Sequence, residues 1–406
     1  MRRSAPFPVL FFASAAHGMN HVLIALYLTL VLVVAQDWHL PYNDLIALWA
    51  PGAMMLGLGA PLSGWLGDRF GQTRMLIACF TGLGISSVLA GFAQTTLQLE
   101  GALALLGLSG SIYHPVGFPW VVRHAFVRGR AIASTGIAGS FGVALSPVVA
   151  GGLATLAGWR VGFIVPGALT IILGLALLAF HLSGRITDRK DDAVEHALTT
   201  HADKMRAFAV LGVTMTITLA LYSAFGTALP KMIQIGTAAG TYGFFAIGLV
   251  TGVISLLGSG AQFIGGHFAD RGHAKRAYLA GFALLAVVFP LVIYSGGWSL
   301  VIAGIAVTFL FEWIAPIETL LLARYAPAAR RGLVFGIRYG LAAIGTPAGV
   351  WLVAKLYDPE TAFTNVFIVL AGLSIAALAF ALFLPADQKK PTAIQPDAAL
   401  AKNMDV

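Results

Sequence analysis

Charge is scarce in this chain. Asp, Glu, Lys and Arg make up 10% of the 406 residues, and hydrophobic residues make up 58%, whereas a soluble globular protein carries about 25% charged residues. A single soluble core could not bury so much apolar surface, but a lipid bilayer could. The composition therefore excludes an ordinary soluble domain and favours a protein that lies in the lipid bilayer.

Other absences narrow the function. The chain has one cysteine, Cys79, so it cannot form an internal disulfide. It lacks the G-x-x-x-x-G-K-[S/T] loop of many ATPases, and no nucleophile stands beside a recognisable base. We therefore expect no enzyme activity, no cofactor and no structural metal. The net charge of +8 comes from basic residues between apolar runs, which suits orientation in a membrane better than a nucleic-acid partner.

Long apolar runs recur along the whole chain. The predicted spans are 19 to 28 residues long, which is enough to cross a bilayer. We predict an all-α membrane protein with twelve transmembrane helices in two pseudo-symmetric halves of six. The predicted spans are 7–34, 44–66, 75–93, 97–120, 131–156, 159–181, 207–229, 242–268, 277–295, 299–322, 333–356 and 363–384.

Lys and Arg fall mostly on one side of this arrangement. If both termini are cytoplasmic, the outer side holds only Arg160, Lys231 and Lys355 of the 25 basic residues, and Arg338 lies within the eleventh span. Such an asymmetry follows the positive-inside rule. We expect an integral protein of a bacterial inner membrane, in contact with the lipid bilayer, with both termini in the cytoplasm.

One long polar segment divides the chain after six spans. We expect an N-terminal six-helix half at 1–181, a cytoplasmic linker at 182–206 and a C-terminal six-helix half at 207–384. The polar residues 385–406 are expected to form a disordered cytoplasmic tail.

A short charged sequence occurs twice. GWLGDRFGQTR, residues 64–74, follows the second span, and GHFADRGHAKR, residues 266–276, follows the eighth span 202 positions later. The loops after the fourth and tenth spans also share two arginines at corresponding positions. Two halves with a common plan are typical of secondary transporters built from repeats.

The G-x-L-x-D-R-x-G-x-x-R pattern, the twelve spans and the central linker resemble the major facilitator superfamily over residues 7–384. The resemblance implies a cavity between the halves and a loop acid that helps to hold the cytoplasmic side shut. That acid would be Asp68, with Arg69 and Arg74 as expected partners, although an ordinary positive-inside loop is the alternative. The implied cytoplasmic gate consists of Gly64, Asp68, Arg69, Gly71, Arg74, Arg123, Arg130, Asp270, Arg271 and Arg276.

The fifth span also resembles a subgroup of this superfamily. GVALSPVVAGG, residues 142–152, is similar to the Gly-Pro motif of many proton-coupled exporters, although Ser146 stands where a glycine would precede the proline. A glycine-rich packing face with a proline kink is the alternative. The motif positions are Gly142, Pro147, Gly151 and Gly152.

Ionisable groups within apolar spans are costly and tend to face a cavity. In the first span, His17 and His21 are four residues apart and share a helix face, with Asn20 near both. Such histidines can carry a proton or bind an anion or a metal, or they can bond to neighbouring helices as neutral rings. HGMNH, together with SIYHPVG in the fourth span, resembles the fosmidomycin-resistance-like branch, which tends to carry Asp where His21 stands.

Two acids and an arginine lie in the later spans. Glu312 is suited to carry a proton, or it could be a buried partner of Arg338 or of a histidine. Glu318, six residues later, is expected to serve a gate or an ion pair. Arg338 is expected either to bind a substrate anion or to complete the cytoplasmic charge network.

The fourth span holds a proline, Pro115, which frees the carbonyl of Ser111. The resulting kink beside Tyr113 and His114 either shapes a substrate site or only bends the helix. Tyr222 in the seventh span is expected in the cavity wall. The full set of expected substrate-binding or proton-binding residues is His17, Asn20, His21, Tyr113, His114, Tyr222, Glu312, Glu318 and Arg338.

The leading hypothesis is a monomeric secondary transporter that exports a small organic molecule in exchange for protons by alternating access. One alternative is an importer or facilitator of an organic anion. Another is a transport-dead sensor or lipid-handling protein on the same scaffold. A minority hypothesis is transport of a metal or metal chelate held by the three histidines of the first and fourth spans.

Overall fold

The computed structural model describes residues 6–125, 128–187, 201–262, 264–265, 273–325 and 337–385. Nearly all of these residues are helical, as expected for a chain in lipid, where each backbone polar group needs a partner within the protein. The first group of helices is α1 (Phe7–Trp38), α2 (Tyr42–Ala47), α3 (Ala50–Phe70), α4 (Gln72–Phe92), α5 (Thr96–Gly110), α6 (Tyr113–His124), α7 (Arg128–Ala157) and α8 (Trp159–Leu182).

The second group follows the polar segment. It comprises α9 (His201–Gly236), a short 3₁₀ helix η1 (Ala238–Gly240), α10 (Phe244–Ser259), α12 (Ala274–Ile293), α13 (Trp298–Tyr325), α15 (Ala342–Leu356) and α16 (Thr364–Leu382). Within the described residues, ten helical stretches are long and apolar enough to cross a membrane, and α10 is a shorter apolar helix. Each of the twelve predicted spans overlaps at least one of these helices.

Two predicted spans are interrupted. The span 44–66 is divided between α2 and α3, and the span 97–120 is divided between α5 and α6. The second break lies at residues 111 and 112, directly before the turn that carries Pro115. Because proline has no N–H, the carbonyl of Ser111 loses its helical partner, and the next helix begins at Tyr113.

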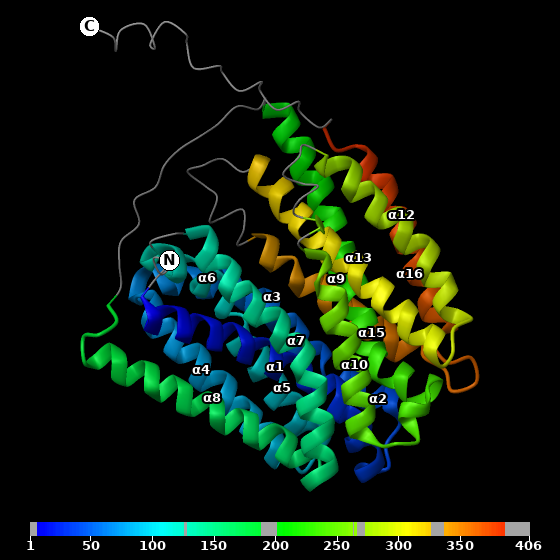
Figure 1. The fold of residues 1–406 in the computed structure, drawn as a ribbon, viewed down its shortest axis with the longest axis horizontal. Helices are drawn as coiled ribbons and strands as arrows, with labels where there is room; N and C mark the ends of the chain where they lie inside the picture. Colours follow the sequence, from blue (N-terminus) through cyan, green and yellow to red (C-terminus); the bar gives the residue numbers. More distant parts are fainter. Residues whose placement is uncertain are drawn as a thin grey trace, which may run out of the picture.

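The helices pack as two groups that meet along two seams. Figure 1 shows α1 and α3 to α8, in blue to green, on one side of the molecule and α9 to α16, in green to red, on the other, with the short helix α2 lying against the second group. Within the first group α1 packs on α7 and α4 on α8; within the second, α9 packs on α15 and α12 on α16. Between the groups, α7 contacts α10 and α3 contacts α15. We call the first group the N half and the second the C half.

Glycines allow the helices of the two halves to approach closely at both seams. A Cβ atom on Gly248 of α10 would overlap the backbone of Pro147, and one on Gly252 would overlap the carbonyl of Ala144. On the other seam, a Cβ on Gly57 of α3 would overlap the backbone of Ala343 in α15. Small residues at helix contacts are the usual packing solution within a bilayer.

Successive spans reverse direction, so the bundle has two ends. We call the end that holds Phe7, Phe70 and Leu382 the terminal end, and the opposite end the far end. At the far end the halves are joined around Tyr42, whose hydroxyl donates to the Thr227 carbonyl at 3.1 Å. Asn43 Nδ2 donates to the Tyr357 carbonyl at 3.1 Å. The far end of the interface is therefore closed.

The outer surface suits lipid. Large apolar side chains such as Leu156, Ile172 and Leu291 are exposed along the helices, an arrangement that would cause aggregation in water. Tyr242, Tyr294 and Trp298 are exposed at the far end, where aromatic residues typically meet lipid headgroups. The chain is thus an integral membrane protein.

Candidate functional site

A cavity of about 340 Å³ lies between the two halves. Its wall is mostly apolar and comes from both halves. Five of the predicted site residues line it, namely Asn20, His21, His114, Tyr222 and Glu312. The described lining does not include the other four predicted residues, His17, Tyr113, Glu318 and Arg338.

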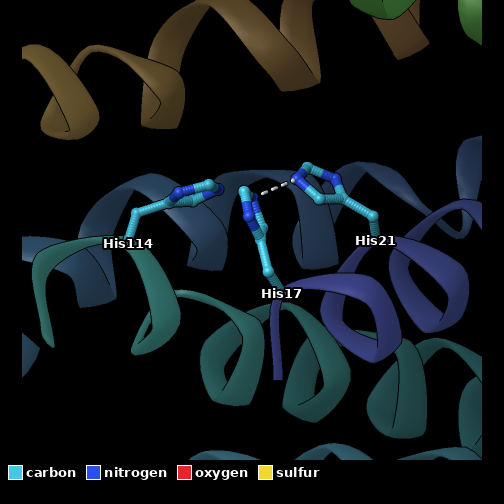
Figure 2. Close-up of side chains that lie close together, drawn as sticks. All are labelled: His17, His21 and His114. Atoms are coloured by element: carbon cyan, nitrogen blue, oxygen red, sulfur yellow. Dashed lines mark hydrogen bonds between the residues drawn. The ribbon is translucent and has the colours of Figure 1, made fainter. Parts of the chain in front are cut away.

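Three histidines gather on the wall formed by the N half. Figure 2 shows His17 and His21 on α1 and His114 on α6, with their rings turned toward one another. His17 Nε2 and His21 Nε2 are 3.1 Å apart, and one ligand-type nitrogen from each ring lies within 4.8 Å of the others. We call these three residues the histidine cluster.

Neighbouring groups fix the His17 ring. Its Nδ1 lies 2.8 Å from the carbonyl oxygen of Thr135 in α7. The ring stacks on Tyr113, with centroids 4.5 Å apart, and Gly139 leaves the space that the ring fills. Tyr113 is itself buried and donates its hydroxyl to the Ala13 carbonyl. Tyr113 therefore supports the cluster from behind.

Asn20 contributes to the cavity wall but carries a buried polar atom without a partner. The residue is 1% exposed, and among the described residues its Oδ1 atom has no hydrogen-bond partner. A buried polar atom without a partner is costly. This oxygen lies near Gly110 of α5 and is shielded from the cavity.

The wall formed by the C half carries an acid. Glu312 in α13 accepts a hydrogen bond from Gln262 Nε2, and the same nitrogen lies 3.1 Å from Ser140 Oγ of α7. Gln262 therefore connects the acid to the opposite half. The sequence offered Arg338 or a histidine as the partner of Glu312; the structure gives Gln262 instead.

Glu318 lies six residues after Glu312 in the same helix, α13, and is enclosed within the C half. It is 4% exposed, and its Oε1 is 2.8 Å from both Thr218 Oγ1 and the Tyr278 hydroxyl. The predicted gate role of Glu318 stays a prediction, but its position is that of a structural hydrogen-bond acceptor.

Arg338 lies beside a second, smaller cavity of about 180 Å³ that it shares with Phe208, Met215 and Leu322. Its guanidinium carbon is 5.4 Å from the centre of the Tyr339 ring. The Tyr339 ring stacks on His114 across the two halves, with centroids 5.2 Å apart. Arg338 thus lies behind the cavity wall, a place that favours the charge-network interpretation over a direct contact with substrate.

The predicted gate is partly visible at the terminal end. Asp68 pairs with Arg123 of α6, at 3.4 Å between Oδ1 and Nη2, and not with Arg69, which lies over the Trp65 ring. Gly71 has φ of 97°, a conformation that favours glycine and ends α3 directly before α4.

Some of the remaining gate residues lie on described helices, and others lie outside the described residues. Gly64 and its neighbour Gly67 pack against Pro115 and Val116 of α6. Arg74 lies in the first turn of α4 and Arg276 in the first turn of α12. Asp270, Arg271 and the side chain of Arg130 lie outside the described residues.

The glycines of the fifth-span motif pack on helices of both halves. Gly142 faces the backbone of Gly18 in α1, and Gly151 faces the backbone of Phe244 at the start of α10. Gly152 lies against the Phe245 ring. Ser146 Oγ donates to the Val22 carbonyl at 2.7 Å. The packing interpretation therefore accounts for the motif, and its link to proton-coupled export stays a prediction.

Sequence reasoning missed three residues at this site: Ser140, Gln262 and Tyr339. Gln262 is a polar residue within a long apolar run, and this feature could have marked it. Ser140 and Tyr339 carry no such signal, because serine and tyrosine are common in membrane helices.

Comparison with known proteins agrees with the fold. A model described as the Major Facilitator Superfamily matches residues 10–311 and 208–403. A solved structure of a bacterial homolog to the human lysosomal transporter Spinster, in an inward-facing and occupied conformation, superposes with a TM-score of 0.72 at 11% identity, covering 95% of both chains.

Two curated relatives are similar in sequence over most of the chain. Multidrug resistance protein MdtG of Proteus mirabilis is 26% identical over 327 residues, or 76% of this chain and 78% of the relative. The probable nitrate/nitrite transporter NarK2 of Mycobacterium tuberculosis is 27% identical over 370 residues, or 85% of this chain and 88% of the relative.

Proposed function

This chain belongs to the major facilitator superfamily and is a membrane transporter, and on that premise we propose that it exports a small organic molecule in exchange for protons by alternating access. The observation that carries the proposal is the hydrogen bond from Gln262 to Glu312 in the cavity wall. It connects Glu312, the only acid among the described lining residues, to Ser140 in the opposite half.

Protonation of Glu312 changes this connection. An ionised carboxylate is a stronger acceptor than a neutral carboxylic acid, so proton uptake weakens the hydrogen bond from Gln262. The link that runs from Glu312 through Gln262 to Ser140 of α7 is then weaker. A proton arriving at Glu312 would in this way favour movement of one half relative to the other.

The cavity wall also bears on the cargo. Among the described residues that line it, Glu312 is the only Asp, Glu, Lys or Arg. Apart from Asn20, His21 and His114, the rest of the wall is apolar with scattered hydroxyl groups, so it suits a molecule with an apolar body and a neutral or positive polar group. The similarity to a protein named for multidrug resistance supports the same class of cargo.

The orientation follows from charge. The terminal end carries most of the basic side chains, including Arg69, Arg74 and Arg123, so we place this end and both termini in the cytoplasm of a bacterial inner membrane. The Asp68–Arg123 pair then lies at the cytoplasmic surface. The cavity lies within one chain, which is consistent with function as a monomer.

The test uses everted membrane vesicles that hold a pH gradient. Apolar cations, neutral drugs, fosmidomycin, organic anions and divalent metals are added one at a time, and collapse of the gradient is recorded. We expect an apolar neutral or cationic compound to collapse the gradient with the wild-type protein but not with Glu312→Gln. Glu360→Gln, in an exposed loop, is the matched control and should behave as the wild type.

A Glu312→Gln protein that keeps full, pH-dependent transport would overturn the proton-coupling part of the proposal. A wild-type protein that gives no response to any compound would contradict exchange itself and favour a sensor or lipid-handling role.

A second candidate is uptake of an anion. The similarity to the probable nitrate/nitrite transporter favours it, and the histidine cluster offers groups that can bind an anion. The position of Arg338 behind the wall weighs against it. Accumulation of a labelled anion in whole cells, without protection against apolar drugs, would favour this candidate.

A further inference from the structure

The histidine cluster carries a feature that proton-coupled export does not use. Three imidazole rings from two helices bring their nitrogens within 4.8 Å of one another, as Figure 2 shows. His21 and His114 line the cavity, and His17 lies directly behind them. The cluster is thus open on one side to whatever enters the cavity.

The hydrogen bonds identify where the free electron pairs point. A carbonyl oxygen only accepts, so the contact from His17 Nδ1 to the Thr135 carbonyl at 2.8 Å places a proton on Nδ1. In the neutral ring, the lone pair then lies on His17 Nε2, which accepts a hydrogen bond from His21 Nε2–H at 3.1 Å. A bound metal ion would replace this hydrogen bond, and His21 would then carry its proton on Nδ1. The tautomer of His17 is the one that a metal-binding histidine adopts when a backbone carbonyl holds its other nitrogen.

The spacing also suits a metal ion. Zinc–imidazole bonds are about 2.0–2.1 Å long, so two nitrogens in a tetrahedral site lie roughly 3.3–3.4 Å apart. The His17 and His21 nitrogens are within a few tenths of an ångström of that separation. Among the described residues, His114 Nδ1 is buried without a hydrogen-bond partner, and the His114 ring would have to move closer to His17 and His21 to complete the set.

We propose that His17, His21 and His114 bind a divalent first-row transition metal ion of the Zn²⁺, Co²⁺, Ni²⁺ or Cu²⁺ class, with one coordination position open to the cavity. Neutral imidazoles suit these ions rather than Mg²⁺ or Ca²⁺, which prefer oxygen ligands. Three neutral ligands leave the charge of the ion uncompensated, so an anionic donor atom of a molecule in the cavity would fill the open position.

The site also touches the opposite half. His114 stacks between Phe118 and Tyr339, with centroid distances of 5.7 Å and 5.2 Å, and Tyr339 belongs to the C half. A metal that pulls the His114 ring toward His17 changes this stacking. Metal occupancy would therefore affect the contact between halves, whatever the direction or coupling of transport.

The experiment is Co²⁺ titration of the purified full chain in detergent, with no histidine tag present. Tetrahedral Co²⁺ gives strong visible absorption, and we expect one equivalent per chain that Zn²⁺ displaces and Mg²⁺ does not. His21→Asn and His114→Asn should weaken binding by about tenfold or more, since even outer-shell changes cost a metal site about 10–100-fold. His39→Asn is the matched control, because His39 is exposed and its φ of 55° is one that Asn tolerates.

A second measurement needs no variant. Cu²⁺ bound to the wild-type chain should show, by electron paramagnetic resonance, hyperfine coupling to imidazole nitrogens. Oxygen-only coordination, or Co²⁺ binding that is equal in the wild type, His21→Asn and His114→Asn, would overturn the proposal. Neither result would bear on proton exchange, which Glu312→Gln tests separately.

Discussion

The two walls of the cavity use different chemistry in the same arrangement. On the N half, His21 and His114 face the cavity and His17 lies behind them. On the C half, Glu312 faces the cavity and Glu318 lies behind it.

The walls differ in how their groups are held. The histidine rings are fixed by stacking and by a carbonyl of their own half, whereas Glu312 is held by a hydrogen bond that leads to the other half. A group that is fixed within its own half is suited to recognise a ligand. A group connected to the opposite half is suited to convert a change in its protonation state into movement of one half relative to the other.

The largest expected effect distinguishes the roles of the two walls. Glu312→Gln should abolish transport against a gradient, because the amide cannot exchange a proton, while His21→Asn should change the compound concentration needed for gradient collapse but leave proton exchange in place. The measurement is gradient collapse in everted vesicles for both variants at matched protein levels. If both variants lose the response equally, the division of roles between the walls is wrong.

Gln262→Met tests the connection between the halves. The side chain keeps its length but can no longer donate to Glu312 or contact Ser140 through a polar atom. We expect proton-coupled exchange to fall by about tenfold, because a hydrogen bond to a charged group contributes about 1.5–3 kcal/mol. Gln234→Met, near the far end of α9, is a suitable control. An unchanged exchange rate would remove Gln262 from the coupling.

Glu318→Gln asks whether the acid behind the wall shares the function of the acid in front. Its Oε1 accepts from groups on α9 and α12, and the neutral amide oxygen accepts these hydrogen bonds more weakly than a carboxylate does. We expect a loss of stability of about 1–2 kcal/mol, seen as a lower thermal midpoint in detergent, with proton exchange retained. Loss of exchange in a well-folded variant would contradict a structural role.

Tyr42→Phe tests whether the walls move relative to one another. The variant removes the hydroxyl that joins Tyr42 to Thr227 at the far end, and a neutral hydrogen bond contributes about 1 kcal/mol. The population with an open far end should rise about fivefold. Spin labels placed on the far ends of the two halves would report this as a longer distance; an unchanged distance distribution would show that other contacts close this end.

The smallest effect is expected for Asp68→Asn. The Asp68 side chain is 70% exposed in its pair with Arg123, and exposed ion pairs contribute roughly 0–1 kcal/mol. The thermal midpoint should therefore barely change. Any clear loss of transport would show that Asp68 makes a stronger contact in another conformation, as the family resemblance implies; unchanged transport would favour the ordinary positive-inside loop.

Much of the fold could be predicted from the sequence, because hydropathy and length decide which segments lie in a bilayer. The twelve spans, the two halves and the family follow from such local signals. The break between α5 and α6 was only partly foreseen, since Pro115 indicated a bend but the division into two helices depends on how α6 packs.

The site was less predictable. His17 and His21 could be paired from their spacing on one helix. The position of His114 beside them, and of Gln262 beside Glu312, depends on contacts between residues far apart in the chain. Arg338 and Glu318 lie in apolar spans, as Glu312 does, yet the structure puts them behind the wall, and no feature of their local sequence marks this difference.

The glycine seams have a consequence for the energy of switching between states. At Gly57, Gly248 and Gly252 backbone lies against backbone, so few side chains need to change rotamer when one half pivots on the other. The bias toward one state then rests largely on contacts at the ends, such as those of Tyr42 and Asn43, each contributing about 0.5–1.5 kcal/mol. A bias of this size can be reversed by the binding of a single ion or molecule.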